Sequence, residues 1–191
     1  METTTLEQIA GQIKKCTLCP LAQGRTHAVP GEGNPHAELL FIGEGPGQKE
    51  DESGRPFVGA AGKFLEQMLT AINLKREDVF ISNVVKCRPP DNRDPLPDEV
   101  ETCTTHYLFK QVELINPKLI ITLGRHSMHR FLPEEFKISE VHGKPFRRHG
   151  RVYLPLYHPA AALYTGSMRP LQIKDMQRVP LILKKLKNQA S

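Results

Sequence analysis

A metal site is the chemistry that this sequence suggests most directly, because it contains four cysteines, Cys16, Cys19, Cys87 and Cys103. They form a C-x2-C pair and, after a gap of 67 residues, a C-x15-C pair. C-x2-C pairs occur in zinc sites and redox motifs, and four thiolates suit either zinc or an iron–sulfur cluster. Cys103 is the cysteine most easily explained by burial in a core, because it shares a predicted helical face with Val100 and Tyr107. The spacing alone leaves zinc, iron–sulfur and burial open.

A glycine-rich segment, residues 43–62, is the second candidate for chemistry. It begins Gly43-Glu44-Gly45-Pro46-Gly47, and glycines allow a ligand to approach the main chain closely. Its acidic residues disfavour a phosphate, and the absence of Gly-Lys-Ser/Thr excludes a P-loop. An ordinary strand-to-helix loop explains any five of these residues but not all 20. The segment therefore predicts a ligand-binding loop.

The elements that must position these residues are predicted from hydrophobic patterns. Buried strands are predicted over residues 38–43, 79–85, 118–123 and 152–156, and helices over 64–72, 100–115, 125–131 and 171–186. A capping box at Thr5 starts a further helix, and Pro180 should start or kink the last one. Strands that alternate with helices predict an α/β fold, a three-layer α/β/α sandwich around a central four-stranded parallel sheet.

Parallel sheets bind ligands beyond the carboxyl ends of their strands. Three predicted strands are followed there by the most unusual segments of the chain, residues 43–62, 83–94 and 157–163. We therefore expect these three segments to form one site.

The same three segments resemble the motifs of family-four uracil-DNA glycosylases. The first match runs from Gly43-Glu44-Gly45-Pro46-Gly47 to Gly54-Arg55-Pro56-Phe57-Val58-Gly59 and Ala61-Gly62. The second runs from Asn83-Val84-Val85-Lys86-Cys87-Arg88-Pro89-Pro90 to Asn92-Arg93-Asp94-Pro95, and the third is His158-Pro159-Ala160-Ala161-Ala162-Leu163. With the cysteines, the resemblance spans about residues 16 to 163. It implies a monofunctional hydrolase that removes uracil from DNA in base excision repair.

The resemblance also implies roles for individual residues. Phe57 would stack on uracil, and the Asn83 amide would pair with O4 and N3–H, which rejects cytosine. His158 would donate to O2 as negative charge develops on the leaving base. Other members of the superfamily carry an aspartate where Gly45 stands here, so Glu44 and Glu50 remain as the candidate catalytic carboxylates. The substrate-binding set is Gly43, Glu44, Gly45, Phe57, Asn83 and His158.

For the cofactor and the DNA, the resemblance implies a [4Fe–4S] cluster on all four cysteines and a wedge in the minor groove. Leu163 or Tyr164 would fill the gap that the flipped base leaves. The remaining candidate DNA contacts are arginines that would bind phosphates, namely Arg88, Arg93, Arg148 and Arg169.

Composition sets the wider expectations. The chain is 39% hydrophobic and 25% charged with a net charge of +5, which is compatible with single- or double-stranded uracil-containing DNA as partner. Neither a membrane span nor a signal peptide is evident. We expect a monomeric cytoplasmic protein, one domain over residues 1–191 with an N-terminal cluster-binding segment. Replication or repair proteins stay open as partners.

Three alternatives remain. The first is a relative that crosslinks covalently to uracil-DNA, but its basic, histidine-containing insertion is not found between Cys87 and Cys103. The second is a non-catalytic iron–sulfur DNA-binding protein, and the third is a hydrolase of free nucleotides.

Overall fold

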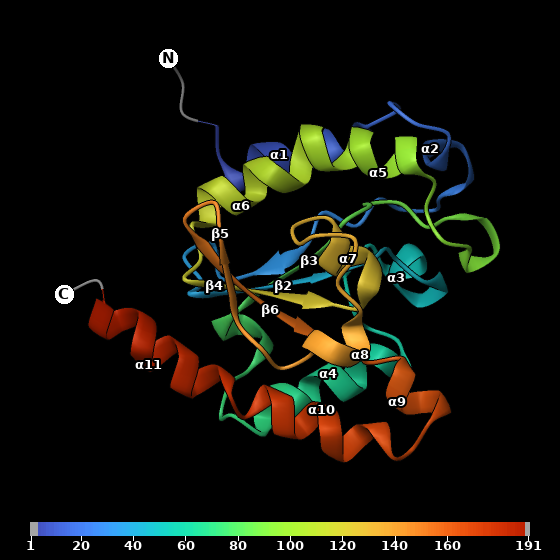
Figure 1. The fold of residues 1–191 in the computed structure, drawn as a ribbon. Helices are drawn as coiled ribbons and strands as arrows, with labels where there is room; N and C mark the ends of the chain where they lie inside the picture. The colour runs from blue at the N-terminus through green and yellow to red at the C-terminus, as the bar shows by residue number, and fades with distance from the viewer. Residues whose placement is uncertain (1–3, 190–191) are drawn as a thin grey trace.

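The architecture centres on a six-stranded sheet. It is seen in a computed structural model that describes residues 4–189 of the chain (Figure 1). Along the sheet the strands follow the order β1-β3-β2-β4-β6-β5, with β3, β2, β4 and β6 parallel and the two outer strands antiparallel. The strands are β1 Glu32–Gly33, β2 Leu39–Gly43, β3 Phe80–Asn83, β4 Leu119–Leu123, β5 Phe146–Arg148 and β6 Arg151–Leu156.

The four predicted strands are confirmed as the parallel centre of the sheet. All residues of β2, β3 and β4 are buried, because helices cover both faces, and this explains their continuous apolar runs. The sheet nevertheless has six strands rather than the four predicted, because an antiparallel strand is added at each edge. β1 has only two residues, and β5 belongs to a charged hairpin with Arg147 and Arg148, so neither carries an apolar signal.

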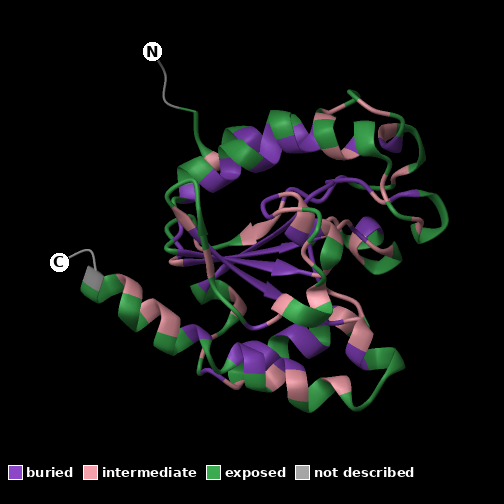
Figure 2. Cartoon of the chain, viewed as in Figure 1, coloured by how far each residue is buried: buried purple, intermediate pink, exposed green. Residues whose placement is uncertain are grey.

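Helices cover both faces of the sheet, which confirms the three-layer prediction (Figures 1 and 2). One face packs against α1 and α6 through a core that includes Ile9, Ile13 and Val112. The other packs against α4 and α10 through a core that includes Leu65 and Met176. The helices are α1 Leu6–Lys15, α2 Leu21–Gly24, α3 Gln48–Ser53, α4 Ala60–Thr70, α5 Pro97–Cys103, α6 Phe109–Ile115, α7 Arg125–His129, α8 Ile138–Val141, α9 Ala161–Tyr164, α10 Met168–Met176 and α11 Val179–Gln189.

Two predicted helices are divided. The helix expected over residues 100–115 consists of α5, a π-helical turn Thr104–Leu108 and α6. The helix expected over 171–186 is interrupted between α10 and α11, and Pro180 is the second residue of α11, where a proline starts a helix. The capping box at Thr5 is confirmed, with Gln8 as its partner. Within residues 4–189, no helix is long and apolar enough to cross a membrane.

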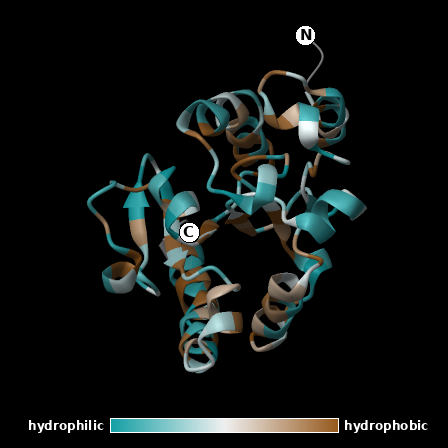
Figure 3. Cartoon of the chain, turned by 90° about the vertical axis from the view of Figure 1, so that its right-hand side faces the viewer, coloured by the Kyte–Doolittle hydropathy of each residue, from teal (hydrophilic) through white to brown (hydrophobic). Residues whose placement is uncertain are grey.

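The carboxyl ends of the parallel strands all lie at the side of the molecule where α3 and α9 begin. Figure 3 faces this side and shows mostly hydrophilic loops around it, with hydrophobic residues deeper inside. Backbone hydrogen bonds extend the β2–β3 pairing past the strands, from Val84 N to Gly43 O and from Val85 N to Glu44 O (both 3.0 Å). The glycine-rich segment therefore leaves the sheet directly beside Asn83.

Candidate active site and cysteine site

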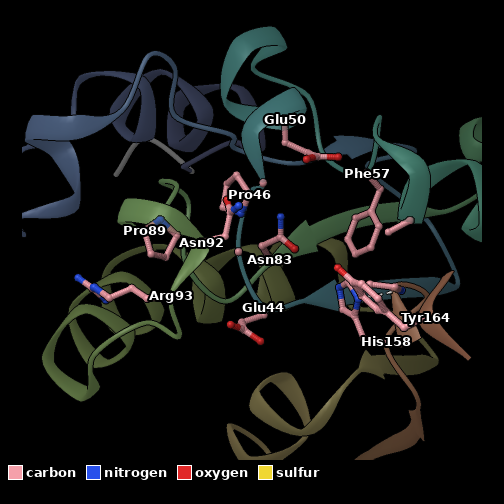
Figure 4. A pocket seen from close by; sticks show the side chains of 14 residues that line it. Glu44, Pro46, Glu50, Phe57, Asn83, Pro89, Asn92, Arg93, His158 and Tyr164 are labelled. Carbon is pink, nitrogen blue, oxygen red and sulfur yellow. Dashed lines mark hydrogen bonds between the residues drawn. The ribbon is translucent and has the colours of Figure 1, made fainter. Parts of the chain in front are cut away.

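A pocket of about 380 Å³ opens at the carboxyl ends of β2, β3 and β6 (Figure 4). All three segments that were expected to form one site contribute to it, which confirms that expectation. Its size suits a nucleobase with part of a sugar. The pocket is lined by Glu44, Gly45, Pro46, Gly47, Glu50, Phe57, Ala61, Asn83, Pro89, Asn92, Arg93, His158, Ala160 and Tyr164.

Phe57 forms an aromatic wall of the pocket. The residue is 5% exposed, and the centroid of its ring lies 5.7 Å from that of His158 at an interplanar angle of 30°. The residue adopts a φ of 52°, a conformation that is costly for a phenylalanine and that persists only where the surroundings enforce it. Gly43 and Gly62 make the position accessible, since a Cβ at either would lie within 2.6 Å of a Phe57 atom.

Arg76 is a supporting residue that sequence reasoning missed. It donates from Nη1 to the Phe57 carbonyl at 2.8 Å and from Nη2 to the Pro56 carbonyl at 2.5 Å. Its Nη2 also pairs with Glu32 at 2.6 Å, and Arg55 binds the same carboxylate. Arg76 and Glu32 thus hold the strained turn from two distant segments, and no local pattern in the sequence marks these contacts.

Asn83 ends β3 with its side chain in the pocket and only 1% of its surface exposed. Its Oδ1 has no hydrogen-bond partner among the described residues. A buried amide oxygen without a partner costs roughly 1–3 kcal/mol, and a ligand N–H would remove that cost. The side chain is therefore placed to accept a hydrogen bond from a bound ring.

His158 lies opposite Asn83 and is neutral near pH 7, because burial lowers its pKa to about 4. The backbone N–H of Ala160 donates to its Nδ1 at 3.2 Å. Since Nδ1 accepts that bond, the imidazole proton sits on Nε2. The residue is thus a neutral hydrogen-bond donor with a fixed tautomer.

Glu44 and Glu50 both line the pocket but differ in their partners. Glu50 Oε1 accepts hydrogen bonds from the backbone N–H groups of Val58 and Gly59, both at 2.8 Å, and so fastens the loop around Phe57. The Glu44 carboxylate is directed away from Asn83 (Figure 4), and burial raises its pKa. Between them, Gly45 has no room for a side chain without a shift of Val85, because a Cβ there would lie 2.7 Å from Val85 Cγ2.

Asn92 is the other residue that sequence reasoning did not assign a role. It lines the pocket from a short turn in which both Asp91 and Asn92 have positive φ values, 52° and 54°. Arg88 Nε donates to Asn92 Oδ1 at 2.8 Å. The matched motif contained Asn92, but an exposed asparagine in a proline-rich loop gives no further signal.

The predicted DNA contacts fall into two groups. Tyr164 is 89% exposed at the pocket rim and Leu163 beside it is 41% exposed. Arg93 also lines the pocket, although its guanidinium is paired with the buried Glu99 at 2.7 Å. Arg88 lies close by, and Arg169 is exposed over the Phe64 ring, whereas Arg148 lies on β5, beside the amino end of β6 and away from the pocket.

The four cysteines line a single small cavity between α1, α2, α5 and the segment that follows β3. They come from three separate parts of the chain and form no disulfide with one another. Burial raises the pKa of the Cys103 thiol to about 11, so a metal would be needed to deprotonate it near neutral pH. The Arg25 guanidinium donates to Cys87 Sγ at 3.1 Å, and the buried Lys86, which directly precedes Cys87 in the sequence, lines the same cavity. Cations at both places favour a negatively charged group in the cavity.

Taken together, these features define an α/β protein with a pocket at the ends of its parallel strands, walled by an aromatic ring and lined by buried hydrogen-bonding groups. The comparisons with known proteins are specific. A family model described as Uracil DNA glycosylase superfamily matches residues 30–182. A type-4 uracil-DNA glycosylase from Sulfurisphaera tokodaii is 48% identical over 184 residues, which cover 92% of this chain and 83% of the relative. A type-4 uracil-DNA glycosylase from Saccharolobus solfataricus is 49% identical over 183 residues, which cover 91% of this chain and 84% of the relative. One from Thermotoga maritima is 42% identical over 184 residues, which cover 94% of this chain and 95% of the relative. The chain belongs to the type-4 family of the uracil-DNA glycosylase superfamily.

Proposed function

We propose that the protein removes uracil from DNA by hydrolysing the N-glycosidic bond, which leaves an abasic site for base excision repair. The observation that carries the proposal is the unpaired Asn83 Oδ1, which faces a pocket walled by Phe57 and the neutral His158. A stacked base cannot reach such a pocket, so the nucleotide must leave the helix first. Family membership supports the same activity.

Each wall of the pocket has a chemical task. The Phe57 ring stacks on the uracil plane, while Asn83 accepts from N3–H through Oδ1 and donates to O4 through Nδ2. Cytosine presents the opposite arrangement and would leave buried groups unpaired. His158 donates from Nε2 to O2, where negative charge accumulates as the bond to the sugar breaks. Because the imidazole is neutral, it stabilises this charge without transferring its proton.

The water-activating group is assigned to Glu44. Glu50 uses one carboxylate oxygen to hold the Val58–Gly59 backbone, so its first task is structural. The Glu44 carboxylate has no such backbone partner among the described residues, and burial raises its pKa, as suits a general base. Gly45, at the place of the aspartate in other superfamily members, offers no carboxylate.

The cysteine site fits a [4Fe–4S] cluster, with Cys16, Cys19, Cys87 and Cys103 as its ligands. A single tetrahedral zinc needs sulfur atoms about 3.8 Å apart, given zinc–sulfur bonds of about 2.3 Å. In the part of the chain that the structure describes, no three of the thiols have sulfurs that all lie within 4.8 Å of one another. The wider spacing and the two neighbouring cations favour the larger, anionic cluster. Bound there, it would supply a rigid tie between the N-terminal segment and the Cys87–Cys103 region.

The DNA is proposed to lie across the pocket mouth. Tyr164 and Leu163 on α9 are exposed next to the pocket, where an apolar side chain can fill the space left by the flipped nucleotide. Arg88, Arg93 and Arg169 surround the same side as candidate phosphate contacts. Arg148 lies on β5 beside the amino end of β6, away from this pocket, so its phosphate contact stays a sequence-based prediction.

Uracil release from oligonucleotides tests the function. The purified protein is incubated with single- and double-stranded DNA that carries one uracil, and free uracil and abasic sites are quantified, with deoxyuridine monophosphate as the monomer control. We expect catalytic turnover on DNA and none on the monomer. A stoichiometric adduct on a denaturing gel would indicate the crosslinking alternative, and binding without release would indicate a non-catalytic protein. Iron and sulfide analysis of the purified protein, which we expect to be brown, tests the cluster, and colourless protein with bound zinc would contradict it.

A further inference from the structure

A buried lysine, Lys86, lies next to Asn83 but does not line the pocket. It follows the end of β3 by three residues, and only 1% of its surface is exposed. Its Nζ lies 2.7 Å from the Asn83 carbonyl oxygen, 2.6 Å from Ser82 Oγ and 2.8 Å from Gln111 Oε1. Lysine is almost never buried to this extent unless its amine is hydrogen-bonded, and these three contacts provide the partners. The amine therefore serves the interior of the protein rather than DNA or solvent.

Two of these hydrogen bonds have a direction that their acceptors fix. A main-chain carbonyl can only accept, so Lys86 Nζ is the donor to Asn83. Gln111 Nε2 donates to the Pro30 carbonyl at 2.7 Å, which orients the amide and leaves its Oε1 to accept from Lys86. A charged amine has three N–H groups and a neutral amine has two, so both bonds form in either state. The contact with Asn83 therefore does not depend on the protonation of Lys86.

The edge of the sheet explains why a side chain is needed at this carbonyl. The edge strand β1 pairs with β3 as far as Ile81, two residues before Asn83. Pro30 lies just before β1 in the sequence, and a proline has no N–H to donate to a neighbouring strand. Buried carbonyl groups nevertheless need a donor. Lys86 supplies one from its side chain at the place where the edge strand stops.

The direction of the Asn83 amide depends on this stretch of main chain. Figure 4 shows the side chain projecting from the end of β3 into the pocket. Its Oδ1 has no hydrogen-bond partner among the described residues and lies so close to Gly43 that a side chain there would collide with it. Since no protein hydrogen bond holds this oxygen, its position is set by packing and by the backbone that carries it. A shift of the Asn83 carbonyl therefore also moves the amide.

We propose that Lys86 is a positioning residue for uracil recognition, which holds the main chain of Asn83 so that its amide meets the edge of the base. The inference rests on the proposed function, because it takes Asn83 as the residue that binds uracil. Gln111, anchored on the Pro30 carbonyl, keeps the amine against the end of β3. A side chain that is already held in its bound direction loses less conformational entropy on binding, so the base gains the full value of its hydrogen bonds.

The test compares affinities for two oligonucleotides that differ only in the base. One carries a cleavage-resistant 2′-fluorodeoxyuridine, the other a tetrahydrofuran abasic analogue at the same place, and binding is measured by fluorescence anisotropy. Lys86→Met keeps a long unbranched side chain without a donor. We expect it to weaken binding of the uracil oligonucleotide about tenfold, the equivalent of one or two ordinary hydrogen bonds, and binding of the abasic one by less than about twofold. In an Asn83→Ala background the same substitution should cost no further affinity, because it acts through Asn83.

A control variant separates this role from a general loss of stability. Ile115→Ala, at the far end of the helix that carries Gln111, leaves a cavity in the core. It should leave the ratio of the two affinities unchanged. Because Lys86 adjoins Cys87, bound metal is also measured, and Lys86→Met should retain it. Loss of the metal would place the effect at the cysteine site and overturn the inference.

A second variant covers the case in which Lys86→Met does not fold. Gln111→Leu removes one fixed acceptor of the amine and should give a smaller loss of the same kind, on the uracil oligonucleotide alone. Equal losses on both oligonucleotides, or losses that add fully to that of Asn83→Ala, would overturn the inference. A wild-type protein that binds the uracil oligonucleotide but releases no uracil from cleavable DNA would instead contradict the proposed hydrolysis, and the ratio of affinities would still test Lys86.

Discussion

The neutral state of His158 leads to a quantitative prediction about catalysis. Its pKa of about 4 means that almost all of the imidazole is neutral at pH 7. The Ala160 backbone N–H occupies Nδ1 at 3.2 Å, so the pocket receives a single donor, Nε2–H. Loss of one such donor to developing negative charge typically costs about 100- to 1,000-fold in kcat. We therefore expect His158→Ala to lower kcat by that factor while KM changes much less.

The assay is single-turnover uracil release between pH 5 and 9, with wild-type, His158→Ala and His158→Gln proteins. Because the folded pKa lies below the ordinary histidine value, the neutral donor is fully present at pH 6 and is lost only as pH falls towards 4. Near pH 6.5 the wild-type rate should therefore show no pH dependence that is due to His158. His158→Gln keeps an N–H donor and should recover part of the rate. A fully active His158→Ala protein, or a histidine-dependent acid limb near pH 6.5, would refute the neutral-donor role.

Three further outcomes follow from the structure. Asn83→Asp should lower uracil excision at least tenfold and allow detectable cytosine excision, measured on matched oligonucleotides; unchanged selectivity would remove Asn83 from base recognition. Arg76→Met should lower the free energy of unfolding by about 2–3 kcal/mol in urea titrations, because the carbonyls of Phe57 and Pro56 lose a charged donor. The matched control, Arg55→Met at an exposed position, should lower it by under about 1 kcal/mol. Equal effects of the two substitutions would contradict the role of Arg76 at the turn. Cys103→Ser should lose iron and visible absorbance and unfold at lower temperature, and retention of full iron content would exclude it as a ligand.

Much of the fold was predictable because burial on both faces of the sheet leaves a local signature. The four central strands are continuous apolar runs, and the Thr5 capping box begins α1 as predicted. The edge strands β1 and β5 were not predictable in this way, since neither is a buried apolar run. The break before α11 was signalled by Pro180, but its position depends on how α10 and α11 pack against the sheet.

For the site, the sequence by itself determined which residue types are available at the strand ends: the glycine-rich segment, Asn83, His158 and four cysteines in two pairs. Motif register also identified Phe57 as part of the set. These are local properties, because the residue types that suit a strand end or a tight turn do not depend on the segments that pack across the sheet.

Only the tertiary structure decided how those residues act. The unpaired Oδ1 of Asn83, the burial that keeps His158 neutral and the strained φ of Phe57 depend on distant segments, such as the one that carries Arg76. The glycine-rich loop proves to be one wall of a pocket whose other walls come from β3 and β6. One of its carboxylates, Glu50, holds the loop itself, whereas the other, Glu44, faces His126 of α7, a distant segment. Hydrogen-bond geometry and desolvation arise between segments far apart in the chain, so no reading of adjacent residues could have assigned them.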